Sequence, residues 1–176
     1  MTPLEDGPLA RAGRAVFALS RAWAVAGGLV LVAMIFMTVA SVAMRKTLGF
    51  PILGDFELVE LGTAISAFAF LPYCHQANGN VVVDVFTARA SERVKSGLAA
   101  LSSLVLLAIA LILLWRMTEG GYDFYRHHEV TTNLEIPRWW AFPPILISLV
   151  LLALVSLVAF ARELAQTVRA RSSGRR

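Results

Sequence analysis

Two carboxylates, those of Glu57 and Glu60, lie at the start of an apolar stretch of this sequence. Their spacing of three places them on neighbouring parts of one helix face. A carboxylate within a membrane is costly at mid-depth and less so near an end. We expect Glu57 to mark the solvated outer end of a helix. Glu60 lies a turn deeper, so we expect it to face protein and to bind a donor such as Arg45 or a group on a partner.

No set of side chains predicts a reaction centre. Haem held across a helical bundle needs histidines inside the spans, whereas His75, His127 and His128 all lie in predicted loops. Thiol chemistry needs a second cysteine, and the sequence contains only Cys74. Adjacent histidines point apart on a helix, so His127 and His128 indicate a solvated loop rather than a metal site. We therefore expect no enzyme activity, no cofactor and no metal.

The charges fall between long apolar blocks, which indicates a membrane protein. Hydrophobic residues make up 57% of the chain and charged residues 16%, against about half and about a quarter in soluble proteins. Residues 22–44, 96–115 and 139–161 contain no ionisable side chain. As a helix, each block reaches about 30 Å, the thickness of the hydrocarbon core. A fourth stretch, 56–73, is apolar apart from its two carboxylates.

These four stretches predict the fold class. Only helices and closed barrels satisfy every backbone polar group in lipid, and uninterrupted blocks of this length are typical of helices. We therefore predict an all-α membrane protein, a bundle of four transmembrane helices without a soluble domain. A transporter that works alone carries ionisable groups near mid-membrane, and three of the four predicted spans have none. This absence favours a protein that acts through a partner.

The distribution of basic residues predicts the topology. Of the 16 Lys and Arg residues, 11 lie in the two termini and the second loop. The positive-inside rule then places both termini in the cytoplasm. We predict cytoplasmic tails at 1–21 and 162–176 around a transmembrane domain at 22–161, in a multi-pass protein of the bacterial inner membrane. The pI of about 9.8 follows from this topology and from anionic lipid, so we expect no nucleic-acid partner.

Other residues predict contact with the membrane surface. All four tryptophans lie at or near predicted helix ends, as in the aromatic belt at membrane–water interfaces. They are Trp23, Trp115, Trp139 and Trp140. In the second loop, Phe86 belongs to an apolar face at helical spacing, and Arg89 and Arg93 can reach lipid phosphates. We predict an amphipathic interfacial helix between the second and third spans. The alternative is that this segment extends the third span into water.

Several motifs resemble those of a known family in their order and spacing. They are Arg45, Phe-Pro-Ile-Leu-Gly at 50–54, Phe-Glu-Leu-Val-Glu at 56–60, Leu-Pro-Tyr at 71–73, Gly-Asn-Val-Val-Val-Asp-Val-Phe at 79–86, and Thr-Asn-Leu-Glu-Ile-Pro-Arg-Trp at 132–139. Together they are similar to the small, DctQ-like membrane subunit of tripartite ATP-independent periplasmic (TRAP) transporters. The family often has a basic residue and a histidine near the 79–84 stretch, where this sequence has Gln76 and Asn80.

This resemblance implies a three-part secondary active transporter. A periplasmic solute-binding protein captures a small organic acid, a large membrane subunit moves it inward by sodium symport, and the small permease subunit supports the large one as a scaffold. The motifs make Asp84 and Pro137 candidate structural or partner-binding residues, beside Arg45, Glu57 and Glu60. The alternative hypothesis is a membrane assembly or structural protein unrelated to transport.

Overall fold

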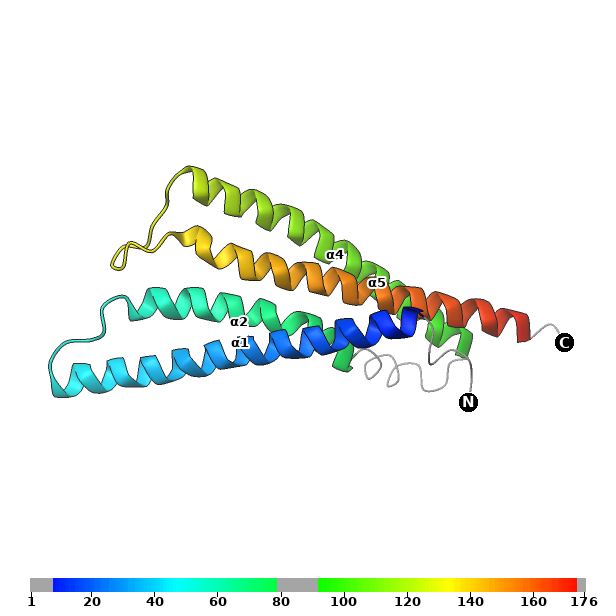
Figure 1. Ribbon diagram of the computed structural model, residues 1–176, viewed down its shortest axis with the longest axis horizontal. Coiled ribbons are helices and arrows are strands. Elements are labelled where there is room, and N and C mark those ends of the chain that lie inside the picture. The colour runs from blue at the N-terminus through cyan, green and yellow to red at the C-terminus, as the bar shows by residue number, and fades with distance from the viewer. Residues whose placement is uncertain (1–7, 79–91, 174–176) are drawn as a thin grey trace.

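A computed structural model of the chain describes residues 8–78 and 92–173, which are helical apart from the connecting loops. The helices are α1 (Pro8–Thr47), α2 (Asp55–Asn78), α4 (Glu92–Arg126), the short 3-10 helix η1 (Arg138–Ala141) and α5 (Phe142–Ser173) (Figure 1). In the described ranges, four helical segments are long and apolar enough to cross a membrane: 13–47, 55–77, 97–126 and 138–164. This confirms the predicted all-α membrane protein with four candidate spans.

The helices run past the ends of the predicted spans. α1 begins at Pro8, inside the predicted N-terminal tail, and α5 continues to Ser173, inside the predicted C-terminal tail. α4 reaches Arg126, and α2 continues for more than a turn beyond Pro72. Charged residues end an apolar block, but Arg, Lys and Glu are good helix formers. At each of these ends the helix therefore continues beyond the apolar block.

The four long helices form an open array of two antiparallel hairpins (Figure 1). α1 packs against α2, α4 packs against α5, and the hairpins meet mainly where α2 packs against α5. Each helix has one most apolar window of 18 residues. The buried share of that window is 39% in α5 and 28% in α2, but only 11% in each of α1 and α4. α5 is therefore central, and the flanking helices α1 and α4 expose most of their apolar surface.

The array has two distinct ends (Figure 1). We call the end that carries the α1–α2 connection (residues 48–54) and the α4–α5 loop (residues 127–137) the loop end. The opposite end, where α1 begins and α5 finishes, we call the terminal end. Because four spans run alternately up and down, the first residue of α1 and the last of α5 lie on the same side of the array.

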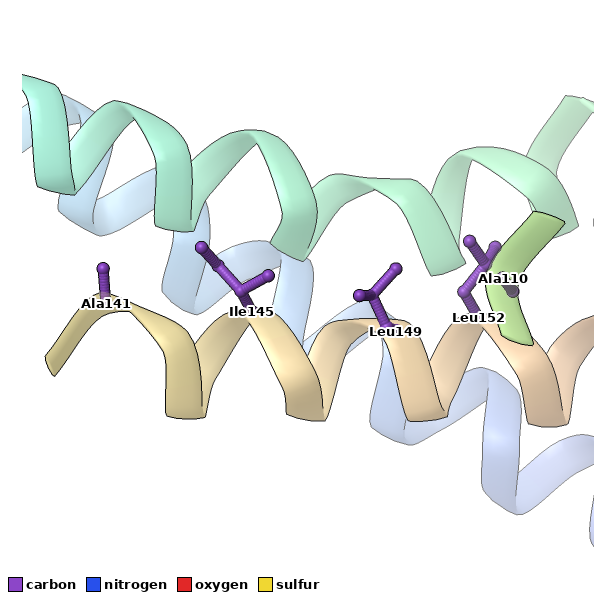
Figure 2. Close-up of a cluster of buried hydrophobic side chains, with 5 residues drawn as sticks. All are labelled: Ala110, Ala141, Ile145, Leu149 and Leu152. Carbon is purple, nitrogen blue, oxygen red and sulfur yellow. The ribbon is translucent and has the colours of Figure 1, made fainter. Parts of the chain in front are cut away.

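The core follows one face of α5. Ala141, the last residue of η1, and Ile145, Leu149 and Leu152 of α5 recur at helical spacing and are buried, together with Ala110 of α4. Ile145, Leu149 and Leu152 point from α5 toward α2 (Figure 2), where partly buried hydrophobic side chains pack against them. Lipid tails are as apolar as leucine, so this packing removes no apolar surface from water. It stabilises the array through van der Waals contacts between the helices. The core thus joins the two hairpins along their length.

Small residues bring α1 and α2 close together. Gly27 is buried, and a Cβ added there would lie 2.6 Å from the Cβ of Ala69. A Cβ on Gly62 would lie 2.7 Å from Cγ of Met34. The buried hydroxyl of Ser66 donates to the carbonyl oxygen of Gly62 at 2.8 Å, which satisfies it within its own helix. The two backbones therefore approach at positions where a larger side chain would hold them apart.

The structure does not support the predicted interfacial helix between the second and third spans. Asp84, Phe86 and Arg89 lie at residues 79–91, outside the described residues. Arg93 belongs to α4, which begins at Glu92 and runs without a break into the third candidate span. From Glu92 onward the backbone continues the third helix, whereas the alternative of an extension into water stays a hypothesis.

Candidate functional site

A hydrogen-bonded cluster at the loop end fixes the start of α2. The hydroxyl of Ser41, on α1, donates to Oδ2 of Asp55 at 2.6 Å and accepts from the backbone N–H of Ile52 at 3.2 Å. Oδ1 of Asp55 accepts from the N–H of Phe56 at 2.8 Å. An aspartate at a helix start satisfies a backbone donor that the helix leaves open. This cluster ties the α1–α2 connection to both of its helices.

Glu57 joins the start of α2 to the α4–α5 loop. Its Oε1 accepts from the backbone N–H of Asn133 at 2.7 Å and from Nδ2 of the same residue at 3.0 Å. Its Oε2 accepts from the backbone N–H of Leu134 at 3.1 Å. Glu57 as a whole residue is only 9% exposed. A buried carboxylate needs such donors, and hydrogen bonds to a charged acceptor are among the stronger ones in proteins.

The loop that Glu57 holds is itself folded. The N–H of Thr131 donates to the carbonyl of Ile136 at 2.9 Å, and the N–H of Ile136 donates to the Thr131 hydroxyl at 3.1 Å. Val130 and Pro137 form an antiparallel bridge. The tip is therefore closed by its own backbone, and the carboxylate binds a preformed turn rather than an extended strand.

A glycine allows the loop to lie flat against the start of α2. Gly54 has φ of 73°, a left-handed conformation that favours glycine. A Cβ at Gly54 would overlap the side chain of Leu134. Leu134 thus covers the turn before α2 while its backbone N–H donates to Glu57. We call this assembly of Gly54, Glu57 and residues 131–136 the loop anchor.

Glu57 and Glu60 of α2 lie in different settings, and that of Glu57 differs from the one we expected. Glu57 was expected to be solvated, yet it is buried and bonded to the loop. Glu60 is exposed, and its carboxylate meets no donor among residues 8–78 and 92–173. Arg45 lies 3.8 Å from Oδ2 of Asp55 rather than beside Glu60. The reason is geometric, because Glu57 faces the α4–α5 loop whereas Glu60, three residues on, is exposed.

The aromatic residues fall into two settings. The indole N–H of Trp23 donates to the hydroxyl of Ser148 on α5 at 2.8 Å, so Trp23 joins two helices, and it lies inside α1 rather than at its end. Trp115 and Trp140 are exposed. The Trp139 ring packs edge-on against Trp140, with centroids 6.4 Å apart. Pro137 precedes η1, and its carbonyl accepts from the N–H of Trp140.

A comparison with protein families matches residues 34–166 to the DctQ component of tripartite ATP-independent periplasmic transporters. The chain belongs to this family. The matched range includes the loop anchor, the last part of α1, all of α2 and α4, and most of α5. Comparisons with curated proteins and with solved structures gave no match.

Membership of the DctQ family makes the chain the small component of a TRAP transporter, which confirms the resemblance seen in the sequence. The family and the four apolar helices together imply a multi-pass protein of the inner membrane. The family also implies partnership with a large membrane subunit and a binding protein. DctQ proteins are transporter components and generally not enzymes.

Two residues of this site were missed in the sequence, and for different reasons. Asp55 directly precedes the predicted second span, and an aspartate in that place is a common helix-start signal. Asn133 carried no comparable signal, because its contact with Glu57 joins residues 76 positions apart. Only its place in the motif at 132–139 pointed to it.

Proposed function

We propose that this DctQ chain is the scaffold of its transporter. It holds a large membrane subunit that takes up a small organic acid by sodium symport, after a periplasmic binding protein has delivered the acid. The family supports the assignment to a TRAP transporter. The scaffold role is supported by the carboxylates Asp55 and Glu57, which form hydrogen bonds within the chain.

The observation that carries this proposal is the engagement of Glu57. A carboxylate that couples ions to transport must exchange its ligands during the cycle. Glu57 instead binds three donors of the α4–α5 loop, and Asp55 binds Ser41 and the start of its own helix. Both carboxylates thus hold the shape of the chain, and the exposed apolar faces of α1 and α4 offer surface for a large membrane partner.

Reconstitution tests the scaffold role. In vesicles with a sodium gradient and the system's binding protein, this chain alone should give no uptake of the organic acid, and adding the large subunit should restore it. Empty vesicles and vesicles with the large subunit alone are the controls. Uptake by this chain alone would contradict the proposal. Failure of the two membrane subunits to copurify would also count against it.

We also propose that both termini lie in the cytoplasm, and reporter fusions test this orientation. Fusions at Gly174 and at Ala88 should report the cytoplasm, and a fusion at Glu129 in the α4–α5 loop should report the periplasm. The shared side of the α1 start and the α5 end is consistent with this orientation. A periplasmic signal at Gly174 together with a cytoplasmic signal at Glu129 would show that the chain has the opposite orientation.

Glu60 is proposed to face the large subunit. It lies on the second candidate span, is exposed, and has no donor in the described part of this chain. A carboxylate left in that state within a membrane is costly. A donor on the large subunit would satisfy it, and Arg45 and Pro137, which also lie toward the loop end, are further candidates for that interface.

A further inference from the structure

A hollow of about 390 Å³ opens at the terminal end of the array. Its lining comes from three helices: Gly13, Arg14 and Phe17 of α1, Gln76 of α2 and Arg162 of α5. Two guanidinium groups from helices far apart in sequence thus meet at one site. A volume of this size is at the lower end of the range for small-molecule sites and suits a compact polar group.

The two arginines lie just outside the charge-free blocks of their helices, on the side where lipid headgroups are expected. Arg162 directly follows the block at 139–161, and Arg14 precedes the block at 22–44 by about two turns. Phe17 lies one turn further toward the apolar part of α1 and is 42% exposed. The hollow therefore combines two positive charges with an aromatic ring on the side toward the apolar block of α1.

The packing around Arg162 gives the hollow a defined shape. The guanidinium of Arg162 lies directly over Gly13, where any side chain would displace it. A guanidinium presents several N–H donors in a fixed plane, a geometry that matches phosphate oxygens. Gly13 thus sets the position from which Arg162 presents its donors beside Arg14.

Buried polar atoms at this end still require partners. Gln76 contributes to the lining of the hollow, and its Oε1 is buried and accepts no hydrogen bond from the described residues. His75 Nε2, on the neighbouring residue, and Ser20 Oγ, on α1, are in the same state. Buried polar groups are normally satisfied by protein, water or a ligand. A half-turn of the Gln76 amide would present its NH₂ group, a donor for an anion, at the position of Oε1.

We propose that this hollow binds a phosphate-bearing anion, namely the headgroup of an anionic phospholipid. Arg14 and Arg162 donate to the phosphate oxygens, the Gln76 amide adds a third donor, and an acyl chain passes along Phe17. Basic pockets between membrane helices bind anionic headgroups by the same chemistry. The site concerns the subunit itself, so its failure would leave the transport role untouched.

Lipid titration of the purified full chain in a neutral detergent tests the site. Binding of a short-chain phosphatidylglycerol, followed by native mass spectrometry, should weaken about tenfold in Arg162→Gln and in Arg14→Gln. Arg21→Gln is the matched control, since Arg21 is exposed on α1 and lies outside the hollow. Equal affinity in the natural chain and in both variants would overturn the proposal.

A parallel titration with inorganic phosphate separates the two sources of the anion. Phosphatidylglycerol binding that depends on both arginines, without phosphate binding, assigns the site to a lipid headgroup. Phosphate binding with the same dependence overturns the lipid assignment and makes the site one for free phosphate. If a variant does not fold, a photoactivatable phosphatidylglycerol on the natural chain replaces it. Crosslinks at residues 13–17 and 162 support the proposal, and crosslinks confined to other segments overturn it.

Discussion

Replacing Glu57 with alanine should release the α4–α5 loop from the start of α2. The substitution removes the acceptor for the N–H groups of Asn133 and Leu134 and for the Asn133 side chain. Loss of hydrogen bonds to a charged acceptor favours local opening. Hydrogen–deuterium exchange of the peptide covering residues 130–136 should therefore accelerate by at least about tenfold. The same peptide in the natural chain gives the reference rate.

Two further variants make this expectation specific. Glu57→Gln keeps one carbonyl acceptor without the charge, so its loop should exchange at an intermediate rate. Glu60→Ala is the matched control on the same helix, since Glu60 bonds to none of the described donors, and the loop should exchange at the natural rate. The proposed effect of Glu60→Ala is confined to copurification with the large subunit. Equal exchange in the Glu57→Ala and natural chains would show that the loop holds without the carboxylate.

Gly27→Ala should loosen the packing of α1 on α2 by about 2 kcal/mol, within the usual range for overpacking. A Cβ there would lie 2.6 Å from the Cβ of Ala69, and neither of these groups can rotate away. The helices must separate by some tenths of an ångström, which costs van der Waals contact along the whole interface. Unfolding in sodium dodecyl sulfate, followed by circular dichroism, measures the loss.

The neighbouring glycine provides the comparison for this variant. A Cβ on Gly28 would lie 3.9 Å from the ring of Phe70, which is ordinary van der Waals contact. Gly28→Ala should therefore change the free energy of unfolding by less than about 0.5 kcal/mol, as for sites without a packing conflict. If both alanine variants unfold at the same detergent concentration as the natural chain, the close approach at Gly27 does not limit stability.

Much of the fold was predictable because lipid imposes simple rules on sequence. The blocks at 22–44, 96–115 and 139–161 lack ionisable side chains; the first two lie within α1 and α4, and the third within η1 and α5. Helix ends were less predictable, because charge marks the edge of the apolar block and not the end of hydrogen bonding. α4, for example, continues to Arg126 through residues that suit either water or a headgroup region.

The loop anchor was beyond sequence reasoning for a different reason. Spacing along α2 places Glu57 and Glu60 near each other, but it does not say which of them faces another part of the chain. That choice depends on α5 and the α4–α5 loop, which lie more than sixty residues later in the sequence. Arg45 likewise pairs with Asp55, across a connection whose path depends on Gly54.

The span between Glu57 and Asn133 also orders the biosynthesis of this protein. Asn133 is polymerised 76 residues after Glu57, a delay of about 4 to 15 s at common ribosomal rates. Until then the carboxylate lacks its amide donors and must be hydrated or protonated. The bond can form only after the ribosome has completed α4, so a nascent chain that stalls before residue 127 keeps this acid unsatisfied. Closure of the contact therefore marks a late step in the maturation of the newly made subunit.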